Sequence, residues 1–239
     1  MRNVLVTGGS RGIGLAIARR LAAIDYNVIA VARRESDELR QAAQQARSLH
    51  FRACDLSRID AIPHFIRALR GEFGAIYGLV NNAGIGTEGL LATMHNSKIE
   101  ALIRLNVLSP VILTKYVVRH MMAEGEGRII NVSSIIASTG YNGLSVYGAT
   151  KAAANGFTRS LAREVGKLGI TVNAIAPGFI DTDLTQALTD EARQRIAARS
   201  ALRRLAEADD VARMVEYLLG EGGRNITGSV LTIDAGNTA

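Results

Sequence analysis

Residues 3–14 read N-V-L-V-T-G-G-S-R-G-I-G, and this stretch decides the fold. Asn3–Thr7 is rich in β-branched residues and predicts a short strand. The glycines that follow permit a tight turn, and Gly14–Ile24 then carries an amphipathic helical pattern. A helix that begins directly after such a turn presents unpaired N–H groups and a partial positive charge to a phosphate. The stretch therefore predicts a strand–turn–helix unit with a phosphate-binding turn.

The remainder of the chain repeats this alternation of short apolar runs with helical patterns such as Ile59–Leu69. Several of the runs are almost continuously apolar, as strands buried on both faces must be. Short connections between them favour a parallel sheet with right-handed crossovers. We therefore predict an α/β fold with one doubly wound, parallel, seven-stranded sheet of the Rossmann type and helices on both faces. After Asn3–Thr7, the predicted strands are Asn27–Ala32, Leu49–Cys54, Ile76–Asn81, Arg128–Val132, Thr171–Ile175 and Val230–Ile233.

The chain shows no repeat, linker or low-complexity segment, so residues 1–239 are expected to form one dinucleotide-binding and catalytic domain. Asp181–Glu207 interrupts the alternation, because it follows a strand and carries only a helical stretch, Thr189–Arg199. A long excursion beyond the carboxyl end of a strand is where ligands bind and lids form in this type of fold. We expect a substrate lid at about residues 181–207, with an extra surface helix as the alternative.

Composition excludes several classes of protein. Apolar residues make up 48% of the chain and charged residues 21%, which favours a folded domain over disorder. The single cysteine, Cys54, excludes an internal disulfide and a cysteine-rich metal site, and no metal is expected. We find no run of about 18 apolar residues and no signal-peptide core. A cytoplasmic protein without membrane association is the expectation.

The net charge of +6 raises the question of a nucleic-acid partner. The basic residues are scattered in ones and twos, and no basic stripe carries interleaved aromatics. We therefore expect no nucleic-acid partner, and interpret the charge as a solvated surface that attracts small anions.

The end of the second predicted strand indicates which dinucleotide binds. Enzymes that use NAD usually place a carboxylate there for the ribose 2′-hydroxyl. Here the strand ends with Arg33 and Arg34, and Glu35 lies beyond it. Guanidinium groups pair with a 2′-phosphate, and Arg11 in the glycine turn can reach the same corner. This pattern favours NADP(H), the alternative being that these arginines are only surface charges.

Tyr147 and Lys151 stand four residues apart in V-Y-G-A-T-K-A-A-A-N-G-F, a stretch with helical character. This spacing places both side chains on one helix face. An ammonium near a phenol is expected to lower the pKa of the phenol. Such a tyrosine can protonate a developing alkoxide while hydride arrives from a nicotinamide.

These features occur together with further motifs, and over its whole length the chain resembles the short-chain dehydrogenase/reductase family. The resemblance implies that Ser134 binds the substrate carbonyl, that Tyr147 is the acid/base, and that Lys151 lowers its pKa and holds the nicotinamide ribose. It implies that Asn106 anchors a water that replaces the proton. The motifs, in order, are T-G-G-S-R-G-I-G, Asp55-Leu56, N-N-A-G at Asn81–Gly84, Asn106, Ser134, Tyr147 with Lys151, and P-G-F-I-D-T at Pro177–Thr182.

The resemblance also implies contacts to the cofactor: Asp55 and Leu56 along the adenine, Asn82 at the adjoining ribose, and Ile180 with Thr182 at the carboxamide. Single motifs have simpler readings: Asn106 could cap a turn, and Ser133 could be mistaken for Ser134. The full predicted cofactor set is Gly8, Ser10, Arg11, Gly12, Ile13, Gly14, Arg33, Asp55, Leu56, Asn82, Tyr147, Lys151, Ile180 and Thr182.

Within the family, S-L-A-R-E-V (Ser160–Val165), Gly169–Asp183 and N-I-T-G (Asn225–Gly228) are similar to the 3-oxoacyl-acyl-carrier-protein reductases of fatty acid biosynthesis. This likeness implies NADPH-dependent reduction of a 3-oxoacyl thioester, on acyl carrier protein or CoA, to the 3-hydroxyacyl form. The chain departs from that pattern where a carrier-docking enzyme would hold arginines, because it has Leu168 and Gly125 there.

Two other functions stay open at this point. The first is an oxidoreductase of another secondary alcohol or ketone, such as a sugar, a polyol or a small ketone. The second, of a different class, is a catalytically silent NADP sensor, which predicts damage to the four catalytic positions, yet all four are intact.

The resemblance further implies a homotetramer built on the helix that carries Tyr147 and on the carboxyl-terminal segment. Packing within the monomer is the alternative. The small residues expected on the far side of this helix are Ala152, Ala153, Asn155 and Gly156, together with Phe157 and Ser160.

Overall fold

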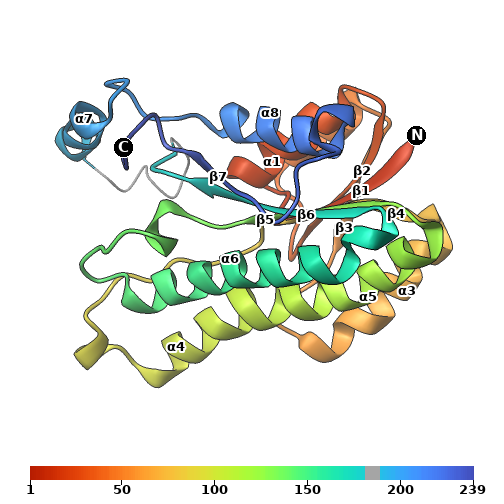
Figure 1. The fold of residues 1–239 in the computed structure, drawn as a ribbon, viewed down its shortest axis with the longest axis horizontal. Coiled ribbons are helices and arrows are strands. Elements are labelled where there is room, and N and C mark those ends of the chain that lie inside the picture. The colour runs from red at the N-terminus through yellow and green to blue at the C-terminus, as the bar shows by residue number, and fades with distance from the viewer. Residues whose placement is uncertain (181–188) are drawn as a thin grey trace.

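The computed structural model describes residues 1–180 and 189–239, and its centre is a seven-stranded parallel sheet (Figure 1). The strand order β3-β2-β1-β4-β5-β6-β7 reverses between β1 and β4, which is the doubly wound arrangement predicted from the sequence. All six neighbouring pairs are parallel. The strands are β1 (Arg2–Thr7), β2 (Tyr26–Ala32), β3 (Leu49–Ala53), β4 (Ile76–Asn81), β5 (Gly127–Val132), β6 (Ile170–Pro177) and β7 (Val230–Ile233).

Helices cover both faces of the sheet, as predicted (Figure 1). On one face lie α1 (Gly12–Ala22), α2 (Asp37–Gln45) and α8 (Ala208–Leu219). On the other lie α3 (Ile62–Phe73), α5 (Ser109–Glu124) and α6 (Ser145–Val165). Each layer buries its own apolar cluster against the sheet, and this burial is the main stabilising term of the fold. The remaining helices are α4 (Asn96–Ile103) and α7 (Asp190–Arg199).

The pairing of α1 with α8 fixes the turn that precedes α1. Arg20 on α1 forms ion pairs with Glu216 and, at 3.3 Å, with Asp209 on α8. A capping box between Glu207 and Asp210 satisfies the first backbone N–H groups of α8. The amino terminus of α1 is thereby held at the carboxyl edge of the sheet.

One long helix has the length and hydropathy of a membrane-spanning segment, although no such segment was expected from the sequence. Asn96–Glu124 is continuous through α4, a π-helical turn at Arg104–Leu108 and α5, and it is long and apolar enough to cross a membrane by length and composition. The sequence contains no unbroken apolar run of that length, because polar residues interrupt this helix while its average hydropathy stays high. Leu113, Val117 and Met121 of this helix are buried against the sheet, as expected of a core helix.

The expected lid is described only in part. Residues 181–188, among them the predicted cofactor residue Thr182, lie outside the described residues. The predicted helix within Thr189–Arg199 is confirmed as α7, with the Thr189 side chain accepting a hydrogen bond from the Ala192 N–H at 3.2 Å. Ile180 and Ala206 form a parallel bridge, so the two ends of the excursion lie together. That the segment acts as a lid stays a prediction.

Candidate active site

The loops that follow β1, β4, β5 and β6 carry the predicted site residues to one edge of the sheet. In a parallel sheet the carboxyl ends of all strands meet at the same edge, and a crevice opens where the strand order reverses. Here that point lies between β1 and β4. We describe the site from the glycine turn after β1 towards the helix α6.

The glycine turn requires glycine at Gly8, Gly12 and Gly14, because a larger residue at these positions would be strained or would clash with the backbone. Gly8 and Gly12 have φ angles of +66° and +52°, the left-handed region that favours glycine. A Cβ atom at Gly14 would lie 2.1 Å from the carbonyl oxygen of Gly8. The glycine turn therefore packs directly against the first helical turn of α1. The amino terminus of α1 lies at this contact, where its unpaired N–H groups can bind a pyrophosphate.

Asn82 and Thr7 brace this turn from the neighbouring strand. The Asn82 Nδ2 donates to the carbonyl oxygens of Thr7 at 2.9 Å and Gly8 at 3.3 Å. The Thr7 hydroxyl oxygen accepts from the backbone N–H groups of Asn82 and Ala83, both at 3.0 Å. The structure thus gives Asn82 a supporting role that the sequence did not reveal. That Asn82 also lines the ribose stays a prediction.

The end of β2 presents two guanidinium groups, Arg33 and Arg34, which form no ion pair within 4 Å among the described residues. Arg33 and Arg34 are exposed, whereas Glu35 is half-buried and paired with Arg40 at 3.0 Å. Glu35, the next carboxylate along the chain, is therefore paired with Arg40 and not with Arg33 or Arg34. This is the environment that a 2′-phosphate requires and that a free ribose hydroxyl does not.

Asp55 and Leu56 lie at the end of the adjacent strand β3. The Asp55 carboxylate accepts from the Ser57 hydroxyl at 2.7 Å and from the Ser57 N–H at 3.0 Å. These bonds, with a smaller contribution from Arg33, lower the pKa of Asp55. Leu56 is buried in the cluster beneath α3, so its side chain serves packing.

Tyr147 and Ser134 meet at the carboxyl edge of β5. Tyr147 lies in the first turn of α6, and its hydroxyl lies near enough to the Ser134 side chain for that side chain to influence its pKa. Burial raises the pKa of Tyr147, and the Ser134 side chain offsets part of that rise. The neighbouring Ser133 donates instead to the carbonyl of Lys151 at 3.1 Å. The geometry therefore assigns the two serines to different tasks, with Ser134 at the tyrosine.

Lys151 lies one turn farther along α6 and is almost fully buried, with 8% of its surface exposed. Its Nζ donates to the Val132 carbonyl at 2.8 Å and lies 5.7 Å from the centre of the Tyr147 ring. Burial lowers the pKa of Lys151 to about 8. Burial leaves the pKa of Tyr147 above its ordinary value here, and the Lys151 ammonium is directed at the Val132 carbonyl. That Lys151 lowers the pKa of Tyr147 stays a prediction.

Asn106 occupies the π-helical turn of the long helix, a distortion that often marks functional sites. Its Oδ1 accepts from the Ile85 N–H and its Nδ2 donates to the Ile85 carbonyl, both at 2.9 Å. The Nδ2 also donates to the Thr150 hydroxyl at 3.2 Å. Asn106 therefore does not cap a turn, but ties the loop after β4 to the catalytic helix α6.

A buried polar network beneath the site was not predicted. Asn81 donates to the Asn131 side chain at 2.8 Å, and Asn131 donates to the Thr158 hydroxyl on α6 at 2.8 Å. A cavity of about 30 Å³, the size of a water molecule, adjoins Asn81, Asn106 and Lys151. Asparagines on neighbouring strands carry no sequence signal for such a network, because it depends on the register of β4 against β5.

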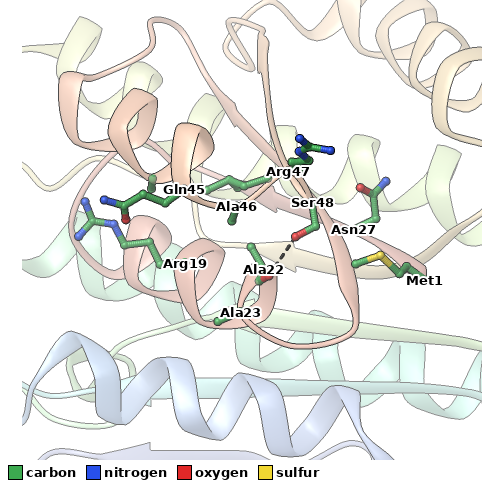
Figure 2. Close-up of a pocket in the computed structure, with 11 residues that line it drawn as sticks. Met1, Arg19, Ala22, Ala23, Asn27, Gln45, Ala46, Arg47 and Ser48 are labelled. Atoms are coloured by element: carbon green, nitrogen blue, oxygen red, sulfur yellow. Dashed lines mark hydrogen bonds between the residues drawn. The ribbon is translucent and has the colours of Figure 1, made fainter.

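A larger hollow lies away from these residues. It has a volume of about 690 Å³ and is bounded by the ends of α1 and α2, with Arg19, Gln45 and Arg47 on its wall (Figure 2). None of the predicted site residues lines it. Across the described parts of the chain, no group of three or more His, Cys, Asp or Glu residues could hold a metal ion.

Leu168 and Gly125 lie side by side, at the opposite edge of the sheet from Tyr147. Gly125 ends α5 just before β5, and Leu168 follows α6 just before β6. A Cβ atom at Gly169 would lie 2.4 Å from the Gly125 carbonyl oxygen, so the two turns are in contact. The positions where carrier-docking arginines were expected therefore form one surface, remote from the chemistry.

Comparison with known proteins gives concordant matches. The family model described as short chain dehydrogenase matches residues 2–193. The 3-oxoacyl-[acyl-carrier-protein] reductase of Escherichia coli (strain K12) is 41% identical over 238 residues, which cover 97% of this chain and 95% of that protein. The protein of the same name from Vibrio cholerae is 40% identical over 232 residues, with the same coverage.

Solved structures agree with the fold. A short chain dehydrogenase from Burkholderia cenocepacia J2315 in complex with NADP has a TM-score of 0.92 and 37% identity, and the match covers 100% of this chain and 98% of that one. A structure of ElxO with NADP bound has a TM-score of 0.92 and 33% identity, with coverage of 99% and 98%.

Proposed function

Because the chain belongs to the short-chain dehydrogenase family, we propose that it is an NADPH-dependent reductase of 3-oxoacyl thioesters. The observation that carries this proposal is that Tyr147 and the buried Lys151 lie one turn apart on α6, beside Ser134 and the end of β5. Near-full-length similarity to reductases of that name supports the substrate class.

The residues present fit a dinucleotide phosphate. The glycine turn is a cradle that a Cβ atom would fill, and it lies at the amino terminus of α1. Gly8, Ser10, Gly12, Ile13 and Gly14 would hold the pyrophosphate through their backbone. At the far corner, Arg11 and Arg33 would pair with the 2′-phosphate. When bound, NADPH supplies the hydride for the reduction.

Tyr147 and Ser134 would act on the substrate carbonyl. The Ser134 hydroxyl donates a hydrogen bond to the carbonyl oxygen and orients it, and the Tyr147 hydroxyl donates the proton that completes the alcohol. Because burial raises the pKa of Tyr147, the phenol is protonated at neutral pH, the form that a reduction needs. Lys151 would hold the nicotinamide ribose, and Asn106 would position the water that returns a proton to the site.

The carrier attached to the substrate is a separate question. The surface formed by Leu168 and Gly125 lacks both expected arginines. A lost guanidinium contact typically costs about 1–3 kcal/mol, so each missing arginine should weaken carrier affinity by about 5- to 150-fold. The acyl group and its thioester arm bind at the other edge of the sheet and do not depend on these positions. We therefore infer reduction of both CoA and carrier thioesters, with a modest advantage for the carrier form.

We also infer that residues 1–239 act as one domain in a cytoplasmic homotetramer. Exposed Ile103 and Leu108 on the long helix, with exposed Ala152 and Gly156 on α6, support an interface at these helices. Asn155 does not belong to that surface, because the structure buries it within the protein. Light scattering at micromolar concentration should show a tetramer, and a 25.5 kDa species would contradict the assembly.

The test is NADPH oxidation with acetoacetyl-CoA, acetoacetyl carrier protein, simple ketones and sugars. Both thioesters should be reduced, and Tyr147→Phe should lower turnover by about 10²- to 10⁴-fold while NADPH binding is retained. Tyr116→Phe, at a half-buried position on α5 that is not among the predicted site residues, is the matched control. Brisk reduction of a sugar or ketone without thioester reduction would replace this function with the alternative. Intact NADPH binding with no reduction at all would point to a sensor.

A further inference from the structure

Two loops at the carboxyl edge of the sheet are fastened to one another. The Gly89 N–H, in the loop after β4, donates to the Gly143 carbonyl at 3.0 Å in the loop before α6. Gly143 has a φ angle of +78°, which favours glycine at this contact. The Leu144 N–H donates to the Tyr141 carbonyl at 3.2 Å. The backbone that carries Tyr141 is therefore held in place next to the first turn of α6.

The Tyr141 ring contacts a second aromatic ring beside the catalytic serine. Its centre lies 6.1 Å from the centre of the Phe179 ring, with the planes tilted by 58°. Phe179 comes two residues after the end of β6, and Ser134 comes two residues after the end of the paired strand β5. The register of Val132 with Ile175 therefore brings the ring pair to the same end of the site as Ser134.

The surface around the ring pair is apolar and open. Tyr141 is 52% exposed, and Leu90, next to the Gly89 contact, is 59% exposed. Leu202 is 61% exposed and anchored by a 3.0 Å hydrogen bond from its N–H to the Ala235 carbonyl, just beyond β7. All three side chains belong to loops at the carboxyl edge of the sheet, where an apolar part of a ligand can reach them.

We propose that Tyr141, backed by Phe179, determines acyl-chain specificity by packing against the hydrocarbon chain beyond the reacting carbonyl. This inference rests on the proposed function and adds to it a preference for medium-length 3-oxoacyl chains over acetoacetyl. Tyr141 does not take part in the proton transfer, so its contribution varies with the length of the chain that covers its ring.

The expected size of the effect follows from burial of methylene groups. Each methylene group that is removed from water multiplies kcat/KM by about four. A ring of this size covers about two of the additional methylene groups of a 3-oxooctanoyl chain. The ratio of kcat/KM for 3-oxooctanoyl to acetoacetyl thioesters should therefore be about 15 in the unmutated enzyme.

The experiment measures this ratio with N-acetylcysteamine thioesters in the full-length enzyme. Tyr141→Ala should lower the ratio below about 3, and Tyr141→Phe, which keeps the ring, should preserve it. The matched control is Tyr217→Ala, because Tyr217 on α8 is 51% exposed but lies away from the site. NADPH binding, followed by fluorescence, checks that each variant folds.

The outcomes separate this inference from the proposed function. An unmutated ratio near 1, or a ratio that Tyr141→Ala leaves unchanged, would overturn the role of Tyr141 while thioester reduction itself stands. A loss of equal size for both chain lengths would show that Tyr141 only supports the loop, and would also overturn it. Absence of reduction of either thioester by the unmutated enzyme would instead refute the proposed function.

Discussion

Removal of the Lys151 charge should change stability in a way that depends on pH. Burial lowers the pKa of Lys151 from 10.5 to about 8, so the folded protein holds this ammonium less readily than the unfolded chain does. The difference corresponds to about 3 kcal/mol of destabilisation, fully present below pH 8. It fades as the pH rises from 8 towards 10.5, because the folded protein then releases the proton that the unfolded chain still binds, and it is gone above 10.5.

The variant Lys151→Met carries no charge and should lack this pH dependence. Methionine also loses the hydrogen bond to the Val132 carbonyl, which costs about 1–3 kcal/mol at any pH. The two effects nearly cancel at pH 7, so the absolute stability there decides little. The change with pH decides the question. Relative to the unmutated protein, the free energy of unfolding of Lys151→Met should fall by about 2 kcal/mol between pH 7 and pH 10.

The assay is urea unfolding followed by circular dichroism, without cofactor and at one fixed protein concentration, since assembly adds to apparent stability. The matched control is Lys167→Met, because Lys167 is exposed and its replacement removes the same charge without the burial. A stability difference for Lys151→Met that is constant between pH 7 and pH 10, or that grows with pH, would refute the reasoning.

Three further predictions follow from the site. Arg33→Asp should remove a preference for NADPH over NADH of about 10²-fold in kcat/KM, since a charge-assisted contact to the 2′-phosphate contributes about 1.5–3 kcal/mol; equal use of both cofactors by the unmutated enzyme would contradict this. Reductase kcat/KM should decline as the pH rises through about 8, where Lys151 loses its proton, and a flat profile from pH 7 to pH 10 would oppose a role for the ammonium. Gly14→Ala should weaken NADPH binding at least about 10-fold in a fluorescence titration, because its Cβ would meet the Gly8 carbonyl at 2.1 Å, whereas Gly71→Ala, which meets nothing within 4 Å, should bind normally.

The sheet could be predicted from the sequence because parallel strands buried on both faces are continuously apolar. All seven strands lie where they were expected, with ends shifted by one or two residues. The helix Asn96–Glu124 was missed, since its polar residues and the π-helical turn obscure the helical period. A periodic apolar pattern identifies a regular α-helix, and this helix departs from the regular period at the π-helical turn that contains Asn106.

The candidate site residues could be selected because their spacing along one helix and after one strand appears directly in the sequence. Their electrostatics could not be predicted. The pKa of Tyr147 depends on how deeply the ring is buried, which no local spacing encodes. The bonds from Asn82 to the glycine turn also join residues 74 and 75 positions apart, a distance that only strand pairing closes.

The separation of Tyr147 and Ser134 from the Leu168–Gly125 surface has an evolutionary consequence. A substitution at Leu168 affects packing against the core, and one at Gly125 strains a backbone with a φ angle of +73°, but both changes lie at the opposite edge of the sheet from Tyr147 and Ser134. Selection can therefore strengthen or abandon attachment to a carrier without a cost in turnover. A duplicated gene with this architecture is free to exchange one metabolic partner for another before its chemistry changes at all.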